Sequence, residues 1–192
     1  MVRISSGSLK GKKVVTSKKI FISTDKDGLR PTSSKVREAI FNIVQTEIYQ
    51  ALFLDLYAGT GAVGLEALSR GAEKVYFVEN NNIRAKAIMD YIHRLGLDDR
   101  ASVYQEEAEA FLNRAVRTGL KFDIIFVDPP YMSGEIDKVL PNIGEDNILK
   151  DEGCLLVEHS SKIALPEKIH NIKLTKNYRY GDTMLTLYRK EK

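Results

Sequence analysis

The sequence predicts an α/β fold: a doubly wound, mostly parallel sheet of seven strands with a C-terminal antiparallel hairpin and a small N-terminal β-hairpin extension. Short apolar segments typical of buried parallel strands alternate with segments of helical periodicity along most of the chain. Gly59, Gly61 and Gly64 follow the first of these strands at G-x-G-x-x-G spacing. Residues 172–178 and 183–188 are rich in β-branched and aromatic side chains and flank a tight turn. Strands alternating with helices favour a parallel sheet, and the final hairpin makes its far edge antiparallel.

Length and composition favour one domain with a small addition. We place a basic hairpin extension at residues 1–30 and the main domain at residues 31–192. No apolar run approaches the roughly 20 residues of a membrane helix, and the N-terminus lacks the apolar segment of a signal peptide. The single cysteine, Cys154, excludes an internal disulfide and suits a reducing compartment. We therefore expect a cytoplasmic protein, monomeric by default, without membrane association.

The elements follow in chain order from turn residues and apolar periodicity. In the extension, residues 2–4 and 13–16 are expected to pair across a Ser- and Gly-rich turn. A serine cap, Ser33 or Ser34, then begins a helix that ends near Tyr49. The predicted strands that follow are 52–57, 75–78, 101–104, 122–127 and 154–157, and the predicted helical segments are 63–68, 83–95 and 106–116, with a partly helical segment over 139–148.

The segment Leu52–Gly71 organises the rest of the chain. An apolar strand ending at Tyr57 leads into the glycine turn, and a helix with an apolar face follows it. In this order a nucleotide-like ligand meets backbone N–H groups at a helix N-terminus, and glycine lets it approach the backbone closely. Glu79 ends the next apolar strand, where a carboxylate can accept hydrogen bonds from ribose hydroxyls. The alternative is an ordinary βα turn with a solvated Glu79.

A second motif, Asp128-Pro129-Pro130-Tyr131, stands directly after the predicted fourth strand. Ligands of open α/β sheets bind beyond the carboxyl ends of the strands, so this tetrapeptide faces the glycine loop if the first and fourth strands are neighbours. Prolines lack N–H groups, which leaves carbonyl groups and the Asp128 carboxylate as acceptors. Acceptors beside an aromatic ring suit a planar base that carries an exocyclic amine and stacks on Tyr131. The alternative is a rigid loop with a surface tyrosine.

Charge is divided unevenly along the chain. Residues 1–37 carry ten Lys or Arg and two Asp, a net charge of +8, whereas the other 155 residues carry 19 basic and 24 acidic side chains, a net charge of −5. This asymmetry indicates that the N-terminal face contacts a polyanion, with a solvated basic arm as the alternative. The three histidines are scattered without metal-ligand spacing, so no metal site is predicted.

Several motifs together carry a family resemblance. Asp55-Leu56-Tyr57-Ala58-Gly59-Thr60-Gly61 and Asp128-Pro129-Pro130-Tyr131 resemble motifs of the amino-methylating class I S-adenosylmethionine-dependent methyltransferases. The bacterial RsmD family is similar nearly from end to end, most clearly in Arg30-Pro31-Thr32-Ser33, in Val36–Asn42, in Gly64–Ala72, in the Lys-rich N-terminal segment and in Tyr180-Gly181-Asp182-Thr183. That family methylates the exocyclic N2 of one guanine in small-subunit (16S) ribosomal RNA. The resemblance implies a Rossmann-like methyltransferase sheet, S-adenosylmethionine as cofactor and the RNA of the small ribosomal subunit as partner.

The resemblance also implies roles for single residues. The methionine end of the cofactor is assigned to Asp55 and to the backbone of Ala58, Gly59, Thr60 and Gly61, its ribose to Glu79 with Asn80 beside it, and its adenine to Glu107 and Ala108. The target base is assigned to Asp128, Pro129, Pro130 and Tyr131. The side chains expected on RNA phosphates are Lys10, Lys12, Lys13, Arg30, Lys35 and Arg37. A structural pair between Arg37 and Glu38 is a nearly equal alternative for Arg37.

The tetrapeptide leaves the nature of the amine open. The same apparatus serves adenine N6 in DNA or RNA and a protein glutamine, so only the basic arm and the family resemblance favour ribosomal RNA. A noncatalytic RNA-binding protein of the same fold is a further alternative, which the intact glycine loop and Asp128 oppose. A nicotinamide-dependent oxidoreductase would explain the glycine spacing and Glu79 but not the tetrapeptide.

Overall fold

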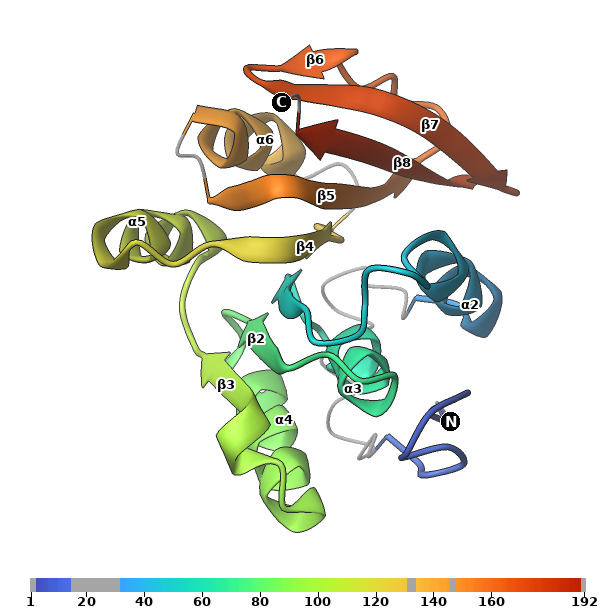
Figure 1. Ribbon diagram of the computed structural model, residues 1–192, viewed down its shortest axis with the longest axis vertical. Helices are drawn as coiled ribbons and strands as arrows, with labels where there is room; N and C mark the ends of the chain where they lie inside the picture. The colour runs from blue at the N-terminus through green and yellow to red at the C-terminus, as the bar shows by residue number, and fades with distance from the viewer. Residues whose placement is uncertain (1–2, 15–31, 131–133, 146–147, 191–192) are drawn as a thin grey trace.

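The fold centres on one eight-stranded sheet with the strand order β3-β2-β1-β4-β5-β8-β7-β6 (Figure 1). The structure is a computed structural model and describes residues 3–14, 32–130, 134–145 and 148–190. Its strands are β1 (Leu52–Leu56), β2 (Lys74–Val78), β3 (Ala101–Tyr104), β4 (Phe122–Val127), β5 (Leu149–Ser160), β6 (Lys168–Ile169), β7 (Ile172–Tyr180) and β8 (Thr183–Lys190).

The first five strands are mutually parallel, and the last three continue the sheet in antiparallel pairs. The predicted doubly wound sheet with a closing hairpin is therefore confirmed. The sheet has one strand more than predicted, because β6 consists of only two residues at the far edge and shows no apolar run in the sequence.

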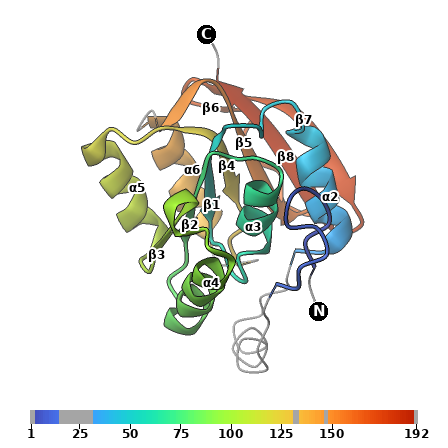
Figure 2. The ribbon, with the colours of Figure 1, turned by 60° about the horizontal axis from the view of Figure 1, so that its bottom comes forward.

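Helices cover both faces of the sheet (Figure 2). On one face lie α2 (Ser34–Ile43), α3 (Ala62–Ser69) and α4 (Asn82–Leu95), and on the other lie α5 (Ala108–Thr118) and α6 (Glu135–Glu145). A single 3-10 turn, η1 (Asp98–Arg100), precedes β3. Successive residues of β1 alternate between the two cores, with Phe53 in the first and Leu54 in the second. Two apolar layers thus bury the sheet from both sides, as a parallel sheet requires.

The helix after the serine cap is shorter than predicted. Ser33 caps α2 by accepting a hydrogen bond from the Val36 N–H, but the helix ends at Ile43 rather than near Tyr49. The backbone leaves the helix at Val44, whose carbonyl accepts hydrogen bonds from the N–H groups of Glu47 and Ile48. In contrast, α4 ends as predicted at Gly96, which adopts a left-handed conformation with φ of 65°.

The N-terminal segment forms a compact turn against α3. One isolated antiparallel bridge joins Arg3 to Lys13, and the apolar side chains of Ile4, Leu9 and Val14 enter the first core. The rest of the predicted hairpin and the proposed domain boundary at residue 30 lie outside the described residues. Within the described ranges, no helix combines the length and apolarity needed to cross a membrane.

Candidate active site

The carboxyl ends of three strands lie side by side at one edge of the sheet. β1 pairs with β2 on one side and with β4 on the other, so Leu56 stands opposite both Val78 and Val127. The predicted neighbourhood of the first and fourth strands is therefore confirmed. The loops that follow these strands begin at the same level. We call residues 57–61 the glycine loop and residues 128–130 the Asp128 loop.

The three glycines of the motif serve different purposes. Gly59 and Gly61 have φ of 56° and 72°, a conformation that other residues rarely adopt, and Gly61 caps the start of α3. Around Gly59 an added Cβ would meet only the Tyr57 carbonyl, at 3.9 Å, so the backbone there is open to a ligand. At Gly64 an added Cβ would lie 2.2 Å from the Phe77 ring, so this glycine permits close packing of α3 on β2.

Asp55 lies buried beneath the glycine loop. Its carboxylate accepts a hydrogen bond of 2.8 Å from the Gly64 N–H, and only 1% of the residue is exposed. Burial raises the pKa of Asp55 to about 7, with a smaller contribution from the nearby carboxylates of Asp128 and Glu79 and against the opposing Gly64 hydrogen bond. Three acidic groups therefore face one region of the site, which favours a positively charged ligand.

Glu79 fastens the glycine loop to the end of β2. One carboxylate oxygen accepts from the Gly59 N–H at 2.8 Å, and the other accepts from the Asn81 N–H at 2.9 Å and from Arg84 Nε at 3.0 Å. A carboxylate has about four acceptor positions, so these bonds leave one for a ligand. The expected role of Glu79 on ribose hydroxyls thus competes with a structural role that the sequence did not indicate.

Two further residues of the expected cofactor set meet at the ends of β2 and β3. The Asn80 side-chain amide donates to both carboxylate oxygens of Glu107, at 3.2 and 3.3 Å, and both residues are exposed. Ala108, the first residue of α5, is buried beside them in the second core. The structure therefore brings these three residues to the same edge as the glycine loop.

Asp128 stands at the end of β4 and is held from α2. The Thr32 hydroxyl, just before the start of α2, donates to Asp128 Oδ2 at 3.0 Å. Burial within the surrounding protein raises the pKa of Asp128, although part of the residue is exposed and the Thr32 hydrogen bond opposes the rise. Its Oδ1 accepts no hydrogen bond from any described residue. Pro129 is buried, Pro130 is half-buried, and Tyr131 lies outside the described residues.

The chain matches a family model described as "Conserved hypothetical protein 95" over residues 2–189. It is 35% identical to the "Putative rRNA methyltransferase YlbH" of Bacillus subtilis, over 98% of this chain and 99% of the relative. It is 32% identical to the "Ribosomal RNA small subunit methyltransferase D" of Escherichia coli, over 99% of this chain and 90% of the relative. A solved structure described as "Putative methyltransferase yhhF from Escherichia coli" superposes with a TM-score of 0.83 at 30% identity, covering 99% of this chain and 98% of that one.

The chain belongs to this methyltransferase family. The predicted RsmD family is confirmed, and with it the class of enzyme and the α/β methyltransferase fold. The roles of individual residues stay predictions, and the geometry above shows which of them lie together.

Tyr57 of the glycine loop contacts the helix that follows the Asp128 loop, in a way that the sequence did not reveal. Its hydroxyl donates to Glu135 Oε2 at 3.0 Å, at the first residue of α6, so the end of β1 is tied to the helix that follows the Asp128 loop. Its backbone has φ of 71°, which is uncommon for a residue other than glycine.

The basic residues expected on RNA separate into two groups. Lys10, Lys12 and Lys13 are exposed on the N-terminal turn, Lys35 is exposed near the start of α2, and Arg30 lies outside the described residues. The prediction that Arg37 contacts RNA is wrong, because only 3% of the residue is exposed and a phosphate cannot reach it. Its guanidinium donates to the Arg3 carbonyl at 2.7 Å and lies 3.7 Å from the buried Glu66, rather than pairing with Glu38.

Glu66 docks the N-terminal turn onto α3. Its carboxylate accepts hydrogen bonds from the N–H and hydroxyl of Ser5, both at 2.7 Å, and from the Ser6 N–H at 3.0 Å. Gly7 also lies against α3, where an added Cβ would fall 1.9 Å from the Ser69 carbonyl oxygen. The three exposed lysines of the turn are thereby held at a fixed place on the first face of the sheet.

Three contacts of the candidate site were not predicted from the sequence: Thr32 with Asp128, Tyr57 with Glu135 and Arg84 with Glu79. Thr32 and Arg84 stand beside predicted helix starts, which indicated only local capping. No metal-binding group of three or more His, Cys, Asp or Glu side chains occurs within the described ranges.

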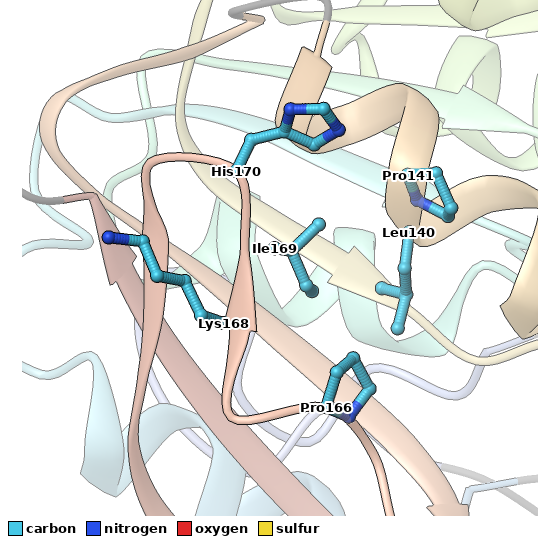
Figure 3. A pocket seen from close by; sticks show the side chains of 6 residues that line it. All are labelled: Leu140, Pro141, Pro166, Lys168, Ile169 and His170. Carbon is cyan, nitrogen blue, oxygen red and sulfur yellow. The ribbon is translucent and has the colours of Figure 1, made fainter.

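A separate hollow of about 250 Å³ lies between α6 and β6 (Figure 3). Ile169 on β6 pairs with Ile172, and Ile172 pairs with Lys190 at the end of β8. Because β8 runs antiparallel to β5, its end lies at the edge of the sheet where the parallel strands begin. Leu140 and Pro141 contribute its α6 side. The hollow is therefore remote from the Asp128 loop, and we assign no ligand to it.

Proposed function

We propose that this protein transfers a methyl group from S-adenosylmethionine to the exocyclic N2 amine of a guanine in 16S ribosomal RNA. The observation that carries the proposal is the β1–β4 pairing, which brings the glycine loop and Asp128 to one edge of the sheet. The charge of Asp128 is close enough to Asp55 to raise its pKa. The relatives named as ribosomal RNA methyltransferases support the RNA substrate. We further propose that the protein acts as a cytoplasmic monomer on the small ribosomal subunit.

The residues of the glycine loop fit such a cofactor. S-adenosylmethionine carries positive charge on its sulfonium and ammonium groups, which suits the acidic groups that surround Asp55. Asp55 and the backbone of residues 58–61, which is open at Gly59, would hold its methionine end, and the remaining acceptor position of Glu79 would hold its ribose. Asn80, Glu107 and Ala108 would lie against its adenine. When bound, the cofactor supplies an electrophilic methyl group.

The task of the Asp128 loop is to orient the amine. The N2 lone pair of guanine is delocalised into the ring, so the amine is a poor nucleophile. Asp128 Oδ1 and the Pro129 carbonyl can accept its two N–H groups while Thr32 fixes the carboxylate through Oδ2. These hydrogen bonds favour the pyramidal nitrogen of the transition state. Asp128 need not be a strong base, because the amine proton can leave after the methyl group has been transferred.

RNA binding is assigned to the exposed lysines of the first face. Lys10, Lys12 and Lys13 on the docked turn and Lys35 on α2 are accessible to phosphates. A guanine within a helical segment must leave the base stack to reach Asp128. Binding through phosphates gives an affinity that falls as salt concentration rises.

The test uses labelled S-adenosylmethionine and small ribosomal subunits that lack their methyl groups. We expect label on guanine N2, identified by mass spectrometry of the digested nucleosides. Asp128→Ala removes the acceptor and should lower kcat by about 100- to 1,000-fold, the range seen when one transition-state hydrogen bond is removed. The matched control is Asp123→Ala on β4, because the Asp123 carboxylate contacts Leu52 and Lys150 instead.

Three results would contradict the proposal. Label on adenine or on protein would assign the same apparatus to another amine. A wild-type protein that binds no S-adenosylmethionine would leave only a noncatalytic role. Full activity of Asp128→Ala would exclude the Asp128 carboxylate from the reaction.

A further inference from the structure

A pocket of about 420 Å³ lies between α2 and β7, outside the glycine loop and the Asp128 loop. Tyr178 and Tyr180 of β7 form one wall. They are two residues apart on a strand and so face the same side of the sheet. The α2 wall consists of Lys35, Glu38, Ala39, Asn42 and Ile43.

The strand register places this pocket at the edge that carries the Asp128 loop. β5 runs parallel to β4 and ends at Ser160, which pairs with Thr183, and Thr183 pairs with Tyr180. The other wall begins close to the same edge, because Thr32, two residues before α2, bonds to Asp128. Both views show α2 with the N-terminal turn on one side and the β7–β8 hairpin on the other (Figures 1 and 2).

The pocket combines aromatic rings with phosphate-binding and base-reading groups. Tyr178 and Tyr180 are half-buried and pack against the first core, so their rings are held in place. Lys176 lies with its Nζ 5.0 Å from the centre of the Tyr178 ring, and Lys35 is exposed at the mouth. Aromatic rings stack on nucleobases, and lysines contact phosphates.

Two polar side chains of α2 favour a base over a phosphate inside the pocket. Asn42 presents a side-chain amide, which can both donate to and accept from the edge of a base. Glu38 presents a carboxylate, which accepts from an exocyclic amine but repels a phosphate. The volume also lies in the range of about 300 to 1,000 Å³ typical of small-ligand sites, which is enough for one base.

We propose that this pocket binds an unpaired nucleotide of the RNA beside the guanine that is methylated. Its base stacks on Tyr178 and Tyr180, and its phosphate lies near Lys35 and Lys176. The inference rests on the proposed function and names the part of the substrate next to the target. Extruding a guanine removes a stacking partner from its neighbour, and an aromatic platform at the same edge of the sheet as Asp128 replaces that partner.

The experiment measures methyl transfer to methyl-deficient small subunits at varied subunit concentration. In the pair Tyr178→Leu with Tyr180→Leu, apolar packing is kept but the rings are lost, so KM for the subunits should rise about tenfold while kcat stays within twofold. The pair Tyr178→Phe with Tyr180→Phe keeps the rings and should stay within twofold of the wild type. The control is Tyr49→Leu, because Tyr49 is 73% exposed and precedes β1 at the opposite edge.

A second readout does not depend on turnover. Ultraviolet crosslinking of small-subunit RNA that contains 4-thiouridine, followed by mass spectrometry, should place a crosslinked nucleotide on Tyr178 or Tyr180. An unchanged KM in the leucine pair would overturn the pocket while wild-type activity still supports the proposed function. If Tyr178→Phe with Tyr180→Phe raises KM as much as the leucine pair does, the hydroxyl groups are responsible and stacking is overturned. If the wild-type protein transfers no labelled methyl group to RNA, both proposals are overturned.

Discussion

The glycine loop and the Asp128 loop share one edge of the sheet but are anchored differently. The Gly64 and Gly59 N–H groups bond to Asp55 and Glu79, which are 9 and 20 residues away along the chain. Asp128 is held by Thr32, 96 residues away. The cofactor side is therefore a local unit of β1, α3 and β2, whereas the target side reaches its geometry only when α2 docks on the sheet.

Glu79, which anchors the glycine loop, and Asp128 differ in the same sense. Glu79 accepts three hydrogen bonds, one of them from the buried cation Arg84. Asp128 accepts one side-chain hydrogen bond, and the surrounding protein raises its pKa. Glu79 therefore has most of its acceptor positions filled by the protein, while Asp128 keeps positions for a substrate amine.

The largest expected effect is on the free energy of unfolding, which should respond differently to substitution of Glu79 and of Asp128. Glu79→Gln leaves Arg84 without its buried counter-charge and should lower the free energy of unfolding by about 3 kcal/mol. It also frees the glycine loop, so we expect about a 100-fold loss of S-adenosylmethionine affinity in calorimetry. Asp128→Asn, which replaces a carboxylate that forms no ion pair with the described residues, should change the unfolding free energy by less than about 1 kcal/mol.

The double variant Glu79→Gln with Arg84→Met sharpens this comparison. With the buried cation also removed, chemical denaturation should show recovery of much of the lost stability, whereas cofactor affinity should stay low. Equal stabilities for Glu79→Gln and Asp128→Asn would show that the two carboxylates are not anchored differently.

The next effect is a pH dependence that originates at Asp55. Its pKa in the folded protein, about 7, lies above the ordinary value of 3.8, so the folded state holds a proton that the unfolded chain releases near pH 4. Asp55 therefore stabilises the ligand-free protein fully below about pH 4, and this stabilisation is lost as the pH rises toward 7.

A cationic ligand prefers the ionised form, so S-adenosylmethionine affinity should change with pH in the opposite direction. It should increase by up to about tenfold per pH unit below pH 7 and level off above it. Titration calorimetry between pH 5.5 and 8.5 measures this slope, and Asp55→Asn should reduce it. An affinity that falls as the pH rises would exclude Asp55 as the partner of the positive charge.

The smallest effect concerns the long-range anchor of Asp128. Thr32→Val removes the hydroxyl that holds Oδ2, and kcat should fall about five- to tenfold, which corresponds to the roughly 1 kcal/mol of a typical net hydrogen bond. Thr32→Ser should retain activity. The neighbouring control is Ser33→Ala, which removes the cap on α2 and should cost about 1 kcal/mol of stability without a comparable change in kcat. A kcat loss in Ser33→Ala that matches Thr32→Val would trace the effect to α2 and not to the Asp128 contact.

Local features of the site were predictable because they depend on spacing along the chain. Gly61 and Gly64 take the conformations and packing that the G-x-G-x-x-G pattern requires, and Gly96 ends its helix where predicted. Failures occurred where local signals compete with tertiary contacts. Arg37 sits in a basic run that indicated RNA, but the neighbouring Glu66 and the Arg3 carbonyl draw it into the protein interior.

The sequence alone determined the order of strands and helices, the glycine turn, the acidic residue after β4 and the family resemblance, because periodicity and motif spacing are local properties. Only the tertiary structure decided which distant groups meet. Thr32 on Asp128, Tyr57 on Glu135 and the tyrosine pocket beside α2 all join segments far apart in the chain. Such contacts arise from sheet register and helix docking, which depend on the packing of the whole core rather than on neighbouring residues.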